Sequence, residues 1–159
     1  MIKFSFFYLF SYLCMVRLRK MDIEKQIEII SREDGLSKTL GIEFFSTPDP
    51  KTVKASMKVD ERNRQPFGFL SGGASLALAE NLAGIGSMAL CPGRICVGIN
   101  VSGSHVKAVP FGGVVTAVAH LQHKGRTIHQ WHIDITNEDK ELISTVAVTN
   151  YILTGRKTE

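Results

Sequence analysis

Apolar residues follow two different patterns along this chain. Between residues 73 and 90 nearly every position is apolar, whereas apolar and polar positions alternate over residues 131–135. A continuous apolar run of this length favours a helix that is buried on most sides, and alternation is typical of strands with one buried face. The first segment is therefore predicted to be a central helix, which ends at Cys91, Pro92 and Gly93.

Strands are predicted on both sides of this helix. Residues 44–46 and 52–59 flank the turn TPDPK, so they should form a hairpin. The joins HKGR and NEDKE further along are short and polar, as hairpin loops are, which favours antiparallel pairing there. The predicted fold class is α+β, with one curved antiparallel sheet wrapped around the long helix. The strands expected after the helix cover residues 95–101, 113–122, 127–136 and 142–153.

The first 20 residues differ in character from the rest of the chain. Residues 4–16 are apolar but too few to span a bilayer without tilt, and no A-x-A-like cleavage site follows them. Basic residues on one side make this leader a candidate for a weak signal anchor. The rival interpretation is that translation starts at Met21, where a short amphipathic helix begins, and that residues 1–20 are a mis-assigned start or a disordered tail. We favour Met21 and expect a single domain over residues 21–159 with no stable membrane span.

Net charge is concentrated in the same leader. The chain has 19 Lys and Arg against 15 Asp and Glu. The excess cations all lie within the first 20 residues, at Lys3, Arg17, Arg19 and Lys20, so residues 21–159 hold 15 charges of each sign. A neutral body without a basic stripe or interleaved aromatic residues argues against nucleic acid as a partner.

Cysteine and histidine spacing does not indicate a metal site. The cysteines are odd in number and form no CxxC pair, which favours reduced thiols in the cytoplasm over a disulfide framework or a zinc site. The cysteines are Cys14, Cys91 and Cys96. The histidines also lack a recurring ligand spacing, and His129 and His132 fall on opposite faces of a strand. The others are His105, His120 and His123. No metal is expected.

Glu80 is the one acidic residue between Arg64 and Arg94, and it lies in the middle of the apolar helix. Burying an unpaired carboxylate costs several kcal/mol unless its pKa rises or it finds hydrogen-bond donors, so such a group is usually placed where its chemistry is used. The alternative is that Arg64, Arg94 or a lysine from elsewhere pairs with it. The neighbours three and four residues away offer no cation: they are Leu76, Ala77, Ala83 and Gly84.

An ordered set of short motifs surrounds this helix: LGIEF, VDERNRQPFGFLSGGASLALAE, VGINVSGSH, and HKGR before WHIDI. On these motifs, residues 39–154 resemble the hotdog-fold acyl-CoA thioesterases, in the branch of the 1,4-dihydroxy-2-naphthoyl-CoA and Arthrobacter-type 4-hydroxybenzoyl-CoA thioesterases. The resemblance implies the hotdog fold and hydrolysis of an acyl-CoA thioester, with coenzyme A as part of the substrate and no separate cofactor. The branch and the apolar surroundings of Glu80 favour an aromatic or bulky acyl group, and menaquinone biosynthesis is one candidate pathway.

The resemblance also implies roles within the block from Gln65 to Glu80. Glu80 is the catalytic carboxylate, either as nucleophile or as general base, and the sequence leaves both open. Gly72, at the start of the helix, supplies a backbone N–H for the oxyanion, helped by the helix dipole. Gln65 holds the acyl group or the attacking water, with a local turn role as the alternative. Gly72 and Gly73 could also serve only a close approach of helix and sheet.

Two positions depart from the family pattern. Ser71 stands before the double glycine, where this branch often has His, and Gly84 stands one turn after the acid, where Ser or Thr commonly orients water. Ser71 can still donate one hydrogen bond in the catalytic site, and Asn81 or Ser87 could position water instead. We still expect hydrolysis, at a lower rate or with a shifted substrate preference. The alternative for which these departures argue is a non-catalytic acyl-CoA-binding or regulatory hotdog module. A hotdog hydratase or dehydratase is the alternative among enzymes, although the His-containing motif of those enzymes is absent.

Further residues are expected to bind the substrate. The resemblance implies a place for His105 at the acyl end of the pocket, with an ordinary strand-end histidine as the alternative. The phosphates of coenzyme A would meet Lys107 and, in the HKGR turn, Lys124 and Arg126, unless these are solvated surface charges. The remaining candidate contacts are Gly73, Asn81 and Ser104.

Helix geometry separates the two main catalytic candidates. At about 1.5 Å per residue, Gly72 and Glu80 lie about 12 Å apart, too far to act on one carbonyl carbon. A neighbouring subunit with an antiparallel central helix would bring the two groups together, as in the family. A homodimer is therefore expected as the minimal active unit, and a homotetramer as the assembly. Gln65 should then act beside Gly72, and Asn81 beside Glu80.

Overall fold

The computed structural model describes residues 20–32 and 35–157, with side chains up to Leu153. The predicted leader lies outside the described residues, apart from its last position. Met21, just after it, is buried, and its backbone N–H and carbonyl both pair with Thr47, at 2.9 and 3.1 Å. Within the described ranges, no helix is long and apolar enough to cross a membrane.

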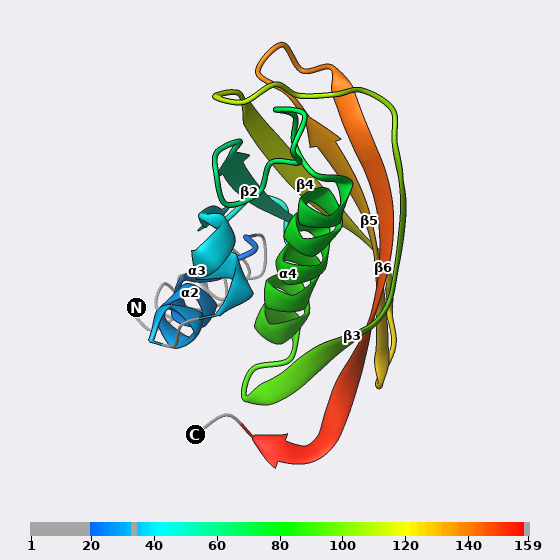
Figure 1. Ribbon diagram of the computed structural model, residues 1–159. Coiled ribbons are helices and arrows are strands. Elements are labelled where there is room, and N and C mark those ends of the chain that lie inside the picture. Colours follow the sequence, from blue (N-terminus) through cyan, green and yellow to red (C-terminus); the bar gives the residue numbers. More distant parts are fainter. Residues whose placement is uncertain (1–19, 33–34, 158–159) are drawn as a thin grey trace, which may run out of the picture.

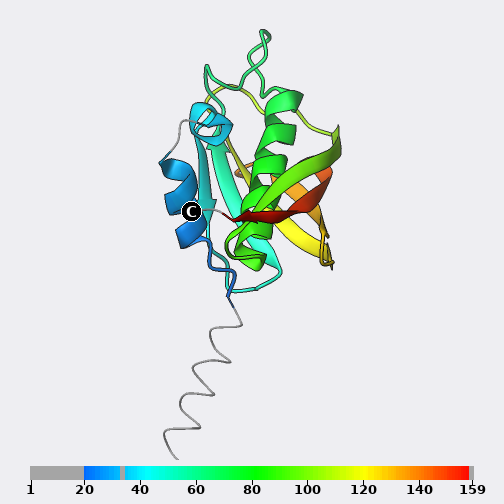
Figure 2. The same ribbon diagram turned by 90° about the horizontal axis from the view of Figure 1, so that it is seen from below.

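One curved antiparallel sheet wraps around a long central helix (Figure 1). The strand order is β1-β2-β4-β5-β6-β3, and every neighbouring pair is antiparallel. Figures 1 and 2 both show α2 and α3 on one side of α4, near β1 and β2, with β3 and β6 on its other side. In chain order the elements are α2 (Glu24–Ser31), α3 (Leu36–Leu40), β1 (Ile42–Phe45), β2 (Thr52–Lys58), α4 (Gly72–Leu90), β3 (Arg94–His105), β4 (Val114–Lys124), β5 (Ile128–Thr136) and β6 (Leu142–Lys157).

The predicted hotdog architecture is confirmed, including the β1–β2 hairpin and the antiparallel run of β4, β5 and β6. The main difference is β3, which was expected over residues 95–101 and extends to His105. The extra residues are strand because they pair with β6 as far as Ser144. That partner lies far away in the sequence, so local alternation could not indicate it.

β3 forms an open edge of this sheet. Among the described strands it bonds only to β6, and Val97 and Ile99 on it are 38% and 56% exposed. The other edge strand, β1, has 4 residues against 12 in β3. A long edge strand with exposed apolar side chains offers unpaired backbone groups to a strand of another chain.

The sheet and α4 pack closely around a buried hydrogen-bond network. A Cβ atom at Gly86 would lie 2.8 Å from the Trp131 ring, so glycine allows the helix to approach the sheet. The adjacent hydroxyl of Ser87 accepts hydrogen bonds from Trp131 Nε1 and Asn150 Nδ2, both at 2.9 Å. Ser87 is fully buried. The suggestion that it positions water beside Glu80 is therefore wrong, since its hydroxyl is committed to the core.

One stripe of α4 is left partly uncovered within the chain. The helix is otherwise buried as predicted, against the sheet and against α2 and α3. Glu80 lies on this stripe and is half-buried, so it is less enclosed than its apolar sequence neighbours suggested. The residues of the open stripe recur every three or four positions, at Gly73, Ala77, Glu80, Asn81, Gly84 and Met88.

Candidate active site

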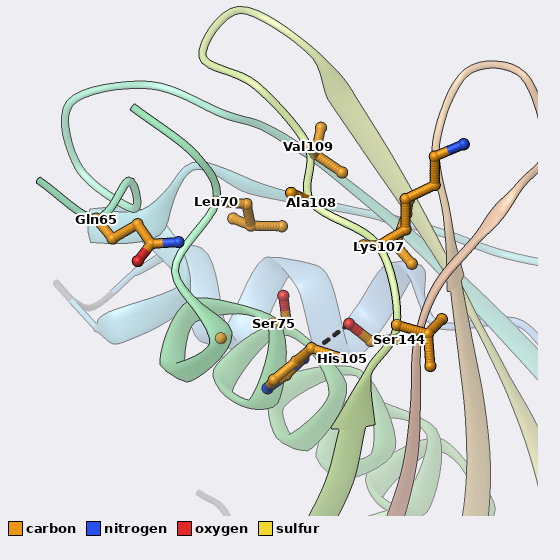
Figure 3. Close-up of a pocket in the computed structure, with 11 residues that line it drawn as sticks. Gln65, Leu70, Ser75, His105, Lys107, Ala108, Val109 and Ser144 are labelled. Atoms are coloured by element: carbon orange, nitrogen blue, oxygen red, sulfur yellow. Dashed lines mark hydrogen bonds between the residues drawn. The ribbon is translucent and has the colours of Figure 1, made fainter. Parts of the chain in front are cut away.

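A hollow of about 340 Å³ opens at the N-terminal end of α4 (Figure 3). It is lined by the loop before α4, the first turn of α4, the end of β3 with the segment after it, and the start of β6. Three candidate site residues, Gln65, Gly72 and His105, line it together with Lys107, a predicted contact for coenzyme A. We call this cavity the Gly72 hollow.

The backbone just before α4 is held in place by the buried side chain of Asn63. This side chain donates to the Lys58 carbonyl at 2.8 Å, and the Asn63 carbonyl accepts from the N–H of Ser71 at 2.9 Å. Ser71 is the N-cap residue, although its side chain makes no capping hydrogen bond. Gly72 is thus the first helical residue, and helix geometry leaves its N–H without an intrahelical acceptor. Such an N–H suits an oxygen atom that gains negative charge.

His105 stands against Gly72. A Cβ atom at Gly72 would lie 2.7 Å from His105 Nε2, closer than real side chains pack. On the other side of the ring, His105 Nδ1 lies 2.8 Å from the hydroxyl of Ser144, which is fully buried (Figure 3). This contact fixes the orientation of the ring. Gly72 therefore does serve a close approach of helix and strand, which is compatible with an oxyanion role for its N–H.

A second hollow, of about 350 Å³, lies across the open stripe of α4. Residues of α2, α3 and β1 form one side of it and residues of β3 the other. Glu80 and Asn81 line it together, among mostly apolar neighbours that include Phe44, Ile85 and Met88. We call this cavity the Glu80 hollow.

The Glu80 side chain lies against Gly98 of β3. A Cβ atom at Gly98 would lie 3.1 Å from the Glu80 carboxyl carbon and closer still to Oε1, so glycine leaves room for the carboxylate. Among the described residues, no ion pair or hydrogen bond to Glu80 occurs, and Arg64 pairs with Glu61 instead, at 2.6 Å. Within these ranges the carboxylate is thus not held by the cations that the sequence offered as partners.

Asn81 is oriented by the helix itself. Its side-chain amide donates to the carbonyl of Ala77 at 2.8 Å. The amide oxygen is therefore the atom that can accept a hydrogen bond from water or substrate beside Glu80.

The two hollows share no residue, and each holds a different half of the predicted site. Gln65 and Gly72 lie in one, Glu80 and Asn81 in the other. Gly72 and Glu80 belong to the same straight helix and are about 12 Å apart along its axis. A single chain therefore does not bring the oxyanion donor and the acid to one carbonyl group.

The three predicted phosphate contacts lie in separate places. Lys107 lines the Gly72 hollow, and its ammonium group forms an ion pair with Glu141, which does not line the hollow. The hydrogen bond from Lys107, and a second one from Asn137, hold the pKa of the Glu141 carboxyl below its ordinary value. Lys124 and Arg126 lie at the β4–β5 turn and line neither hollow.

Three further candidates, Ser71, Gly73 and Ser104, line neither hollow, and two residues that were not predicted contact the site side chains. Gly73 and Ser104 are exposed. Gly98 and Ser144 were missed, although they contact Glu80 and His105. An isolated glycine within a strand is a known sign of close approach by another group, so Gly98 carried a signal. Ser144 carried no sequence signal that could have indicated its contact with His105.

Known proteins are similar to this chain in sequence and in fold. The model of the thioesterase superfamily matches residues 67–144. A 1,4-dihydroxy-2-naphthoyl-CoA hydrolase from Listeria monocytogenes is 37% identical over 124 residues, which cover 77% of this chain and 99% of that protein. The proofreading thioesterase EntH from Cronobacter turicensis is 38% identical over 115 residues, or 72% and 82% of the two chains. A mutant thioesterase from Pseudomonas aeruginosa has a TM-score of 0.75 and 34% identity, covering 86% of this chain and 95% of its own.

The sheet wrapped around α4, together with these relatives, defines a hotdog-fold thioester hydrolase. The chain belongs to the thioesterase superfamily.

Proposed function

We propose that the protein hydrolyses an acyl-CoA thioester to the free acid and coenzyme A in a homodimer. Each active site would combine the Gly72 hollow of one subunit with the Glu80 hollow of the other. The observation that carries this proposal is the division of the candidate residues between two hollows on one helix. A two-fold axis that sets the two central helices antiparallel brings the Gly72 hollow of each subunit next to the Glu80 hollow of the other. Two complete sites then form from two chains that are each incomplete.

Two exposed features support a partner at this face. The edge of β3 has free backbone groups and exposed apolar side chains, and the open stripe of α4 lies beside it. Pairing of β3 with a second β3 would satisfy the edge and cover Val97 and Ile99. The assembly into a homotetramer is proposed from the family resemblance.

The proposed mechanism follows from the negative charge that develops on the thioester oxygen during hydrolysis. The N–H of Gly72 would donate to the thioester oxygen as the carbonyl carbon is attacked, and the helix dipole favours the resulting negative charge. Glu80 would either attack the carbonyl carbon or take a proton from a water molecule that does so. Either route adds water across the C–S bond and releases the acid and the thiol. The Gln65 amide can orient the acyl oxygen or the water.

The two ends of the substrate would meet different surroundings. The apolar wall of the Glu80 hollow favours a bulky or aromatic acyl group. Lys107 at the other hollow would exchange its partner Glu141 for a phosphate of coenzyme A, and Lys124 and Arg126 would serve the nucleotide end. We place the reaction in the cytoplasm, because Cys91 and Cys96 are free thiols and the cysteine count is odd.

Subunit exchange tests this proposal. Glu80→Ala, and Gln65→Ala combined with Gly72→Pro, should each be inactive in a thiol-release assay on a panel of acyl-CoA thioesters. Proline is tolerated at the first position of a helix and removes the N–H. Its ring would also displace His105, since an added Cβ at Gly72 lies 2.7 Å from His105 Nε2, so melting curves must show that this variant folds. A mixed dimer has one intact site, so mixing should restore activity. Verified heterodimers that remain inactive would contradict the shared site, and a wild type that binds acyl-CoA without thiol release would instead be a binding module.

A further inference from the structure

Gly84 has no local structural reason to be glycine. It lies inside α4, where glycine destabilises a helix because the unfolded chain loses more freedom on folding. Its φ is not positive, and an added Cβ atom would meet no atom within 4 Å. At Gly86, two residues later, a Cβ would lie 2.8 Å from the Trp131 ring. Packing within the chain therefore requires glycine at 86 and not at 84.

The space left at Gly84 is continuous with the space in front of the candidate acid. Gly84 lines the Glu80 hollow, and it follows Glu80 by four residues on the open stripe. Positions four apart on a helix are neighbours, with Cβ atoms about 5–6 Å apart. The walls beyond this point are apolar side chains, among them Ile85 and Met88.

We propose that Gly84 sets the size of the acyl group by leaving room beside the reacting carbonyl carbon. The inference rests on the proposed function, because it takes Glu80 as the group that acts on the thioester. A carbonyl carbon in reach of Glu80 or its water lies about 3–3.5 Å from the attacking atom. The hollow beside Glu80 includes the space in front of Gly84, so an acyl group that extends from that carbon into this space lies against Gly84. An aromatic or branched acyl group needs this space, whereas a short straight chain does not.

Substitution of Gly84 by larger residues tests the proposal, and the measured quantity is the ratio of kcat/KM for a bulky acyl-CoA to that for a short one. Wild type, Gly84→Ala and Gly84→Val are compared by kcat/KM for benzoyl-CoA and propionyl-CoA, with thiol release as the readout. One methyl-sized group changes discrimination in a pocket by about 10-fold or more. We expect the benzoyl to propionyl ratio to fall about 10-fold in Gly84→Ala and further in Gly84→Val.

Gly35 provides a matched control. It is the other described glycine with a φ that is not positive and with nothing within 4 Å of an added Cβ. It lies at the N-cap of α3 and does not line the Glu80 hollow. Gly35→Ala should leave the ratio unchanged. Melting curves check folding, and Gly84→Ala should melt no lower than wild type because alanine favours the helix.

The outcomes separate this inference from the function on which it rests. If wild type hydrolyses both thioesters in a way that depends on Glu80, but the ratio is the same in all Gly84 variants, the inference is wrong and the function stands. A wild type that prefers propionyl-CoA also overturns it. If no thioester is hydrolysed, or if hydrolysis is indifferent to Glu80→Gln, the proposed function itself fails.

Discussion

Replacing Gly98 by alanine tests where the Glu80 carboxylate lies. The added Cβ would lie 3.1 Å from the carboxyl carbon and closer still to Oε1, whereas ordinary contacts of a Cβ begin at 3.4 Å. The carboxylate oxygen must therefore retreat by roughly 1 Å, and a displacement of that size costs about 10²-fold in rate. This corresponds to about 3 kcal/mol of transition-state stabilisation. We expect kcat/KM for a thioester to fall by this factor, with most of the loss in kcat.

The fold should tolerate the change, because the atoms in the way are the end of a flexible side chain. The melting temperature is expected to stay within a few degrees of wild type, and sedimentation should show that the assembly is intact, since β3 is the proposed subunit edge. Gly103 on the same strand is a useful contrast. A Cβ there would lie 2.9 Å from the backbone oxygen of Thr145, so Gly103→Ala should lower stability.

A double-mutant cycle decides whether the effect runs through the carboxylate. Gly98→Ala should cost little further activity when added to Glu80→Gln, because the charged group that it displaces is already absent. Equal losses in both backgrounds, or full activity of Gly98→Ala, would refute the reasoning.

Glu80→Gln retains the shape of the side chain and removes its charge, so thiol release should fall by about 10²–10⁴-fold in a folded protein; activity within a few-fold of wild type would exclude a catalytic role. The free energy of unfolding should decline as the pH falls below about 6.5, the ordinary pKa of histidine. Burial lowers the pKa of His129 in the folded protein, so the unfolded chain binds a proton at this residue before the folded protein does. The melting temperature of His129→Leu should depend less on pH, and an unchanged slope would contradict this. Deleting residues 1–20 should leave an active enzyme, because Met21 and its pairing with Thr47 are retained; a folded but inactive product would mean that the leader takes part in function.

The helix and the hairpins could be predicted because their signals are local. An apolar run that ends at Cys91, Pro92 and Gly93, and strands separated by short polar joins, each lie within one stretch of sequence. The place of β3 could not be predicted in this way. Its pairing joins His105 to Ser144, residues that lie 39 positions apart, and such register is decided by the packing of the whole sheet.

The same distinction between local signals and distant pairing explains which site residues could be predicted. Glu80 could be found as an isolated acid in an apolar helix, and Gly72 as part of a double glycine at its start. Gly98 and Ser144 reach the site through the pairing of distant segments. Ser87 was misplaced because α4 is apolar on almost every side, so its pattern does not indicate which side meets the sheet.

Because α4 has no distinct apolar face, the Ser87 hydroxyl is important for the rotational orientation of the helix. A helix that is apolar all round could rotate about its axis and bury much the same apolar area. Only one rotation brings the hydroxyl to Trp131 Nε1 and Asn150 Nδ2, and any other would leave buried donors without acceptors. Apolar packing holds α4 against the sheet, and the hydrogen bonds of Ser87 select one rotation of the helix about its axis. The direction of the Glu80 carboxylate is thus set by a hydroxyl two turns away on the helix.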